Sequence, residues 1–149
     1  LIRYAHKNKI MIDKIIIVEN NIDFINRSKR ILSLLNNIYT HKSNIEFAHM
    51  DALETKKIFE NRKYGKADVV IGTLPYSNML DKLEKLADLY SQITDNFVFY
   101  TYTKIIKMRS GKMATDKMIG LLKERFREVE KSNLILMNLP PAYSILARS

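Results

Sequence analysis

The sequence predicts an α/β fold, with a mostly parallel sheet and an antiparallel hairpin at its end. Short β-branched or aromatic runs alternate with segments whose apolar residues recur at helical spacing, which is typical of strand–helix–strand units. The last segment differs, because two strand-like runs there flank a turn that contains Pro140 and Pro141. At 149 residues the chain is long enough for a core of its own, and we expect a single domain over residues 1–149.

The strands are predicted from apolar, β-branched and aromatic runs. They lie at residues 15–18, 45–48, 67–72 and 96–102, with hairpin arms at 129–137 and 142–148. The β-branched run at 15–18 suits a strand buried on both faces of the sheet, and 67–72 is the clearest buried strand.

Helices are predicted between these strands. The first begins after Asn20 or Asn21, either of which can cap it. Its apolar stripe is predicted from residues at helical spacing, namely Phe24, Ser28, Ile31, Leu35 and Ile38. A weak helix is predicted at 52–61. Two further helices, one opened by Ser77 or Asn78 and one at 114–127, have apolar faces formed by Met79, Leu83, Leu86 and Tyr90, and by Met118, Leu122 and Phe126.

The composition excludes several kinds of site. Because the chain has no cysteine, disulfides, cysteine-ligated zinc and a thiol nucleophile are excluded. Its three histidines, His6, His41 and His49, lack the spacing of metal ligands, so we expect no metal site and a surface position for His49. No apolar run approaches the roughly 20 residues that span a bilayer, and no signal peptide is visible, so we expect a cytoplasmic protein.

The formal net charge of +9 favours an anionic partner. A basic surface attracts nucleic acid or anionic lipid headgroups. The lysines are scattered, however, and the chain is rich in Lys, Ile and Asn together, so compositional bias remains an alternative explanation.

Two acidic residues follow predicted strands, where parallel sheets bind their ligands. Glu19 follows the first strand and could accept hydrogen bonds from two ribose hydroxyls; the alternative is a charge that stabilises the start of the next helix. Asp51 follows the second strand and could accept from an adenine amino group, while the N–H of Ala52 donates to a ring nitrogen. Taken alone, Asp51 favours a helix cap.

The segment after the third strand, Gly72-Thr73-Leu74-Pro75-Tyr76, is more specific. Pro75 stiffens the backbone, Gly72 allows close approach of another group, and Tyr76 offers a ring for stacking or for contact with a positive centre. The alternative is a strand-ending turn with a packed aromatic side chain.

These motifs together resemble the class I S-adenosylmethionine-dependent methyltransferases. Within that class the chain looks like the bacterial phospholipid N-methyltransferases, which are related to the ribosomal RNA adenine dimethyltransferases. The resemblance extends over nearly the whole chain from about residue 15. It rests on Val18-Glu19-Asn20, Met50-Asp51-Ala52, the run at 67–76, the aromatic strand at 97–102 and, most specifically, Asn138-Leu139-Pro140-Pro141-Ala142.

The resemblance implies a Rossmann-like methyltransferase sandwich that uses S-adenosylmethionine as its cofactor. Glu19, with Asn20 beside it, would bind the cofactor ribose, Asp51 with Ala52 the adenine, and Gly72 would lie against the cofactor. The loop formed by Thr73, Leu74, Pro75 and Tyr76 would line the place where the acceptor amine meets the methyl group.

The implied substrate is phosphatidylethanolamine or its partly methylated forms, reached at the inner face of the membrane. Adenine dimethylases place Asn or Asp where this chain has Thr73, whose hydroxyl is a weaker acceptor, and this difference favours lipid over nucleic acid. An RNA or protein methyltransferase of the same fold, and a non-catalytic basic binding module, remain alternatives.

One part of the family pattern has no counterpart in the chain. The family's first strand and glycine-rich loop precede the strand that ends at Glu19, and only residues 1–9, resembling the end of the following helix, stand before it here. Together with Leu rather than Met at position 1, this predicts a truncated, partial methyltransferase domain that lacks its central strand. We expect such a chain to be marginally folded and not to bind the cofactor saturably.

Overall fold

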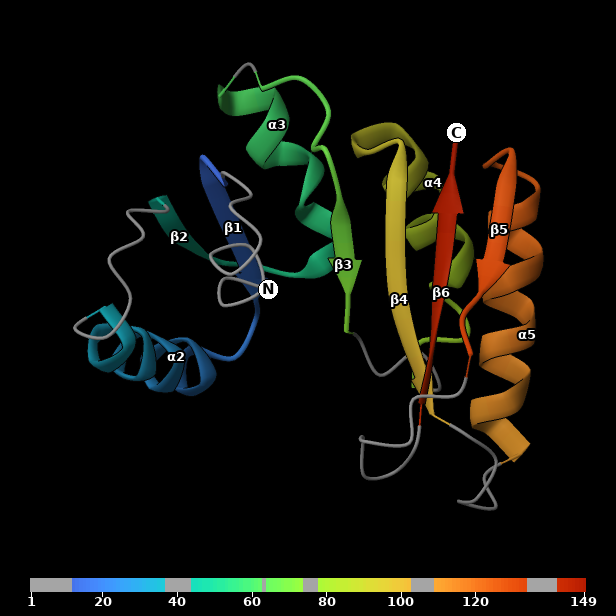
Figure 1. Cartoon of the computed structure of the whole chain (residues 1–149), viewed down its shortest axis with the longest axis horizontal. Helices are drawn as coiled ribbons and strands as arrows, with labels where there is room; N and C mark the ends of the chain where they lie inside the picture. Colours follow the sequence, from blue (N-terminus) through green and yellow to red (C-terminus); the bar gives the residue numbers. More distant parts are fainter. Residues whose placement is uncertain (1–11, 37–43, 63, 74–77, 103–108, 134–141) are drawn as a thin grey trace. The chain divides into compact units, whose positions relative to one another are not determined.

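A computed structural model describes residues 12–36, 44–62, 64–73, 78–102, 109–133 and 142–149. The chain divides into two compact units, Leu1–Thr55 and Lys56–Ser149. Both combine strands with helices (Figure 1).

The first unit is built on two parallel strands. Strand β1 (Lys14–Glu19) pairs with β2 (Asn44–His49), so that Lys14 lies opposite Asn44 and Glu19 opposite His49. Helix α2 (Ile22–Asn36) packs on both strands, and a short 3-10 helix, η1 (Ala52–Glu54), follows β2. Every residue of β1 is half-buried, so the prediction of burial on both faces was wrong. Within the described part of this unit α2 is the one α-helix, and it can cover only one face of the strand pair.

The apolar residues predicted at helical spacing on α2 do share one side of the helix, but that side is not the buried one. Phe24 and Ile31 are 61% and 57% exposed, whereas Ile25 is 2% exposed. The buried side of the helix is therefore turned by about one residue position from the predicted stripe, roughly 100° around the axis. The side chain of Leu35 and residue 38 lie outside the described part of the chain.

The second unit contains a four-stranded sheet in the order β3-β4-β6-β5. Strand β3 (Val70–Gly72) is parallel to β4 (Asn96–Tyr102), while β6 (Ala142–Arg148) lies antiparallel between β4 and β5 (Glu128–Lys131), as Figure 1 shows. The bounds of β4 match the predicted strand. The hairpin is antiparallel as predicted, although residues 134–137 of its first arm lie outside the described residues.

Helices α3 (Lys56–Arg62), α4 (Leu83–Ile93) and α5 (Arg109–Lys123) complete this unit. The predicted apolar residues of α4 and α5 form its core, because Leu83, Leu86, Met118 and Leu122 are all 0% exposed. The α4 side chain Tyr90 stacks on Phe97 of β4, with ring centroids 4.1 Å apart. Helix α4 begins about five residues after its predicted start, and α5 begins about five residues before its predicted start. The weak helix predicted at 52–61 is divided into η1 and α3.

Strand β3 differs most from its prediction. It has three residues rather than six, and Val69 and Ile71 are 45% and 43% exposed. Among the described strands β3 is at the edge of its sheet and pairs only with β4. Ile71 lies opposite Val98, on the sheet face away from the buried ring of Phe97, so alternation along the strand leaves it exposed.

Candidate functional site

The carboxyl ends of β1 and β2 form one edge of the first unit. Glu19 and His49 lie opposite each other at this edge, and the N–H of Met50 donates to the Glu19 carbonyl at 3.2 Å. The exposed ring of His49 donates from Nε2 to the carbonyl of Asn20 at 3.0 Å, which makes Nε2 the protonated nitrogen in this pair. The two strand ends are therefore tied together by backbone and by side chain, and the surface position predicted for His49 is confirmed.

The half-buried Glu19 carboxylate lies just before α2. Its Oε1 accepts from the N–H of Asn21 at 2.8 Å. Asn21 in turn caps α2, because its Oδ1 accepts from the N–H groups of Asp23 and Phe24 at 3.0 and 3.3 Å. Among the described residues, the N–H of Asn21 is the group that donates to the Glu19 carboxylate.

Asp51 caps the 3-10 helix that follows β2. Its Oδ1 accepts from the N–H of Leu53 at 2.9 Å, as the helix-cap alternative predicts. The Thr55 hydroxyl donates to the Ala52 carbonyl at 2.7 Å and closes the turn from its other end. Ala52 is the first residue of this turn, a position whose N–H has no partner inside the helix. The cap uses Oδ1 of Asp51. That the other carboxylate oxygen binds the adenine amino group stays a prediction.

The second unit contributes the end of β3. Gly72, the last residue of that strand, is buried and lies opposite Phe99, and Thr73 directly after it is exposed. Leu74, Pro75 and Tyr76 lie outside the described residues. The chain's predicted site residues thus belong to two units, with Glu19, Asn20, Asp51 and Ala52 in the first and Gly72 and Thr73 in the second.

A pair of threonines at the end of β4 was missed from the sequence. The hydroxyls of Thr101 and Thr115 lie 2.7 Å apart in a hydrogen bond that joins β4 to α5. Because β4 is parallel to β3, this pair lies toward the same edge of the sheet as Thr73, and the 42% exposed Tyr100 occupies the next register position. The threonine at the end of an aromatic strand was visible in the sequence, but its partner 14 residues away was not.

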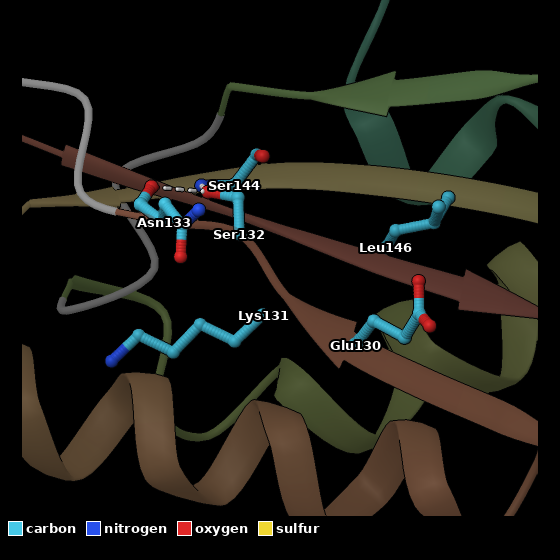
Figure 2. Close-up of a pocket in the computed structure, with 6 residues that line it drawn as sticks. All are labelled: Glu130, Lys131, Ser132, Asn133, Ser144 and Leu146. Atoms are coloured by element: carbon cyan, nitrogen blue, oxygen red, sulfur yellow. Dashed lines mark hydrogen bonds between the residues drawn. The ribbon is translucent and has the colours of Figure 1, made fainter.

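An open pocket of ≈ 540 Å³ lies along β5 and β6 (Figure 2). Its polar groups bond to one another, because the N–H of Ser144 donates to the Ser132 hydroxyl at 2.9 Å and that hydroxyl donates to the Asn133 carbonyl at 2.8 Å. None of the predicted site residues lines this pocket. Over the described ranges no group of His, Asp or Glu side chains could hold a metal ion, and no helix is long and apolar enough to cross a membrane.

Comparisons with known proteins identify the fold. No family model and no curated protein sequence matches the chain. A solved structure from Clostridium thermocellum, assigned as an rRNA methylase, superposes with a TM-score of 0.63 at 12% identity, over 91% of this chain and 72% of that one. The bifunctional kinase-methyltransferase WbdD gives 0.60 at 14% identity, over 89% of this chain and 29% of WbdD. A chain of the fibrillarin/Nop5p complex gives 0.57 at 15% identity, over 100% and 66%.

These similarities confirm the predicted Rossmann-like methyltransferase fold. The pairs β1–β2 and β3–β4 are parallel. Strand β6 is antiparallel to both of its neighbours, and its pairing with β5 is the antiparallel arrangement predicted for the C-terminal hairpin. At identities of 12–15% they establish architecture alone. The chain has the fold of class I methyltransferases, with acidic side chains at the carboxyl edge of β1 and β2.

Proposed function

We propose that this chain is part of an S-adenosylmethionine-dependent methyltransferase that methylates the amine of a phospholipid headgroup, phosphatidylethanolamine. The observation that carries the proposal is the pair of carboxylates at one edge of the first unit, Glu19 as the last residue of β1 and Asp51 after β2, within a methyltransferase fold. Ligands of open α/β sheets bind at this end of the strands.

The cofactor's adenosine half matches these groups. Each carboxylate has one oxygen engaged by a backbone N–H and a second without a partner in the described residues. Glu19 would accept from the ribose hydroxyls, Asp51 from the adenine amino group, and the N–H of Ala52 would donate to a ring nitrogen. Asn20, next to Glu19, is held through its carbonyl by His49, which keeps this turn in place. Gly72 would allow close approach to the cofactor.

The cofactor would supply a methyl group activated by its bond to a positively charged sulfur. The residues of this chain would align the acceptor amine, exclude water and accept a hydrogen bond from the amine N–H. The amine must lose its proton before its lone pair can attack. The exposed hydroxyl of Thr73 would accept from the neutral amine, while Leu74, Pro75 and Tyr76 would surround it.

The choice of a lipid amine rests on Thr73 and on the net charge of +9. A hydroxyl in place of a side-chain amide or carboxylate suits a flexible headgroup better than a planar adenine. Anionic lipid attracts a basic protein to the inner face of the membrane, where we place this one as a peripheral, cytoplasmic protein. An RNA or protein methyltransferase of the same fold is the alternative, and one of the similar solved structures is named as an rRNA methylase.

We further propose that the chain is a partial methyltransferase domain. Among the described strands β1 pairs only with β2, and β3 is the edge strand beside β4. Short, separate pairings of this kind are expected of a methyltransferase domain without the family's first strand. A glycine-rich loop would come with that strand and complete the cofactor site.

Methyl transfer by the product of the complete reading frame tests the proposal. We expect label from S-adenosylmethionine to appear in phosphatidylethanolamine vesicles and not in structured RNA. Glu19→Gln should raise the KM for the cofactor about tenfold, because a charge-assisted hydrogen bond contributes about 1.5–3 kcal/mol. The control Glu60→Gln removes an equal charge from the exposed face of α3 and should leave KM unchanged.

The outcomes separate the alternatives. Thr73→Val should lower kcat and leave the KM for the cofactor unchanged, because the hydroxyl is assigned to the acceptor. Robust labelling of RNA with inert vesicles would overturn the lipid substrate. Absence of label in vesicles, RNA and protein would favour a non-catalytic basic binding module.

A further inference from the structure

Helix α2 has a second apolar stripe that faces solvent. Phe24, Ile31 and Leu34 are 61%, 57% and 67% exposed, and their spacing of seven and then three residues places them on one side of the helix. The helix packs on β1 and β2 through a different side, which includes the 2% exposed Ile25. Among the described residues, no part of the first unit covers these three large apolar side chains.

Basic residues accompany this stripe. Arg27 lies within it, three residues after Phe24 and four before Ile31, and Arg30 flanks it. Both are exposed, and over the described residues neither guanidinium has an ion-pair partner. Lys29 is on another side of the helix, with its Nζ 5.6 Å from the centre of the Phe47 ring on β2. The helix has three basic residues against one acidic residue, Asp23, so the exposed stripe is both apolar and positively charged.

This combination fits an anionic membrane surface better than other partners. At a bilayer interface Phe24, Ile31 and Leu34 would enter the acyl boundary while Arg27 and Arg30 reach the lipid phosphates. Nucleic acid would use the arginines but leave the apolar side chains in water. A second copy packed symmetrically on this face would bring Arg27 toward the same arginine of its partner, which is repulsive.

We propose that α2 is a membrane-docking helix that binds anionic phospholipid through Phe24, Arg27, Arg30, Ile31 and Leu34. The inference deepens the proposed function, because an enzyme acting on a headgroup must lie at the membrane surface. Docking by α2 nevertheless requires no methyl transfer, so the two can be tested separately.

The absence of tryptophan from the chain permits a direct test. Phe24→Trp places a single fluorophore in the stripe, and Tyr64→Trp, at a 39% exposed position of the second unit, is the matched control. With vesicles of phosphatidylglycerol and phosphatidylcholine we expect a blue shift and quenching by acyl-brominated lipid for Phe24→Trp, and neither for Tyr64→Trp. An unshifted Phe24→Trp, or an equal response to pure phosphatidylcholine, overturns the proposal.

Vesicle sedimentation adds the energetic test. Ile31→Ser with Leu34→Ser should weaken binding at least about tenfold, because two apolar side chains no longer enter the interface. Arg27→Gln with Arg30→Gln should weaken binding to anionic vesicles, whereas Lys85→Gln with Arg127→Gln, two exposed charges of the second unit, should have a smaller effect. Far-UV circular dichroism checks that each variant is folded.

The remaining outcomes decide between partners. A lipid-independent blue shift that accompanies a dimer in sedimentation velocity would assign the stripe to a second copy and overturn the proposal. Unchanged vesicle binding by the Ile31→Ser, Leu34→Ser variant would also overturn it. Docking by α2 without any methyl transfer by the complete gene product would support the docking helix and contradict the proposed function alone.

Discussion

The aromatic stack on β4 should hold the second unit together. Phe97 is 0% exposed, its ring stacks on Tyr90 of α4 at 4.1 Å and an interplanar angle of 19°, and it lies 5.9 Å from the ring of Phe99. Phe97→Ala would remove the ring from a site that is closed on all sides. Truncation of a buried Phe costs about 3–5 kcal/mol, which includes the loss of aromatic contacts of about 0.5–1.5 kcal/mol each.

That cost is a large fraction of the stability of a single domain, which is about 5–15 kcal/mol. We therefore expect Phe97→Ala to lose most or all of the cooperative unfolding transition of the second unit. Urea titration followed by near-UV circular dichroism measures it, since the buried Tyr90 is present in both proteins and reports on the packing of this core. The matched control is Tyr100→Ala on the same strand, whose ring is 42% exposed and should contribute less than about 1 kcal/mol.

The comparison of the two variants tests whether the stack of α4 on β4 is the core of the second unit. If Phe97→Ala and Tyr100→Ala lower the free energy of unfolding equally, the stack of α4 on β4 is not the core of this unit, and the argument from burial fails. Because β4 also positions Thr101 and the edge beside Thr73, loss of the stack should disturb the proposed acceptor region as well.

Three further predictions concern single side chains, and a fourth concerns the whole chain. Thr94→Val should lower the free energy of unfolding by about 1–3 kcal/mol, since the buried Thr94 hydroxyl donates to the Ala67 carbonyl at 2.8 Å and accepts from the Asn96 N–H at 3.1 Å. Urea titration measures this loss, and an unchanged free energy of unfolding would show that water takes over both hydrogen bonds. Asp51→Ala should cost about 0.5–2 kcal/mol of stability as a lost cap, whereas Asp51→Ser retains a cap and should lose cofactor affinity alone in the complete gene product; equal cofactor binding by both variants and the wild type would leave Asp51 as a cap only. A hydrogen bond from Arg125 Nε to the Asp88 carboxylate at 2.6 Å raises the pKa of Arg125 above its ordinary value, so the cation and its stabilising contribution persist below that value and are lost only as pH rises beyond it. Arg125→Gln should therefore lower thermal stability by up to about 1 kcal/mol with no added pH dependence between pH 7 and about pH 10, and a steep change in that window would contradict the assignment. Isothermal titration of the 149-residue chain with S-adenosylmethionine should show no saturable binding, and micromolar affinity would refute the partial-domain proposal.

The fold class was predictable because it depends on local patterns. Alternation of β-branched runs with helical periodicity required strands and helices in turn, and the aromatic run at 96–102 became β4 with unchanged bounds. The core residues of α4 and α5 were predictable for the same reason, since Leu86 and Met118 lie on the one apolar stripe of each helix. The placement of Glu19 and Asp51 at one edge also followed from the sequence, because a parallel pair of strands brings its carboxyl ends to the same edge.

Other features depend on which neighbours the elements acquire. Sequence alone could not choose between the two apolar stripes of α2, and packing on β1 and β2 buried Ile25 and left Phe24 in solvent. Val69 and Ile71 were expected in a buried strand, but exposure at a sheet edge depends on strand order, which periodicity does not contain. The bond between Thr101 and Thr115 and the cap made by Asp51 likewise needed coordinates. Sequence thus determined the elements and their polar ends, and tertiary structure decided which faces are buried, because burial is a property of contacts between segments distant along the chain.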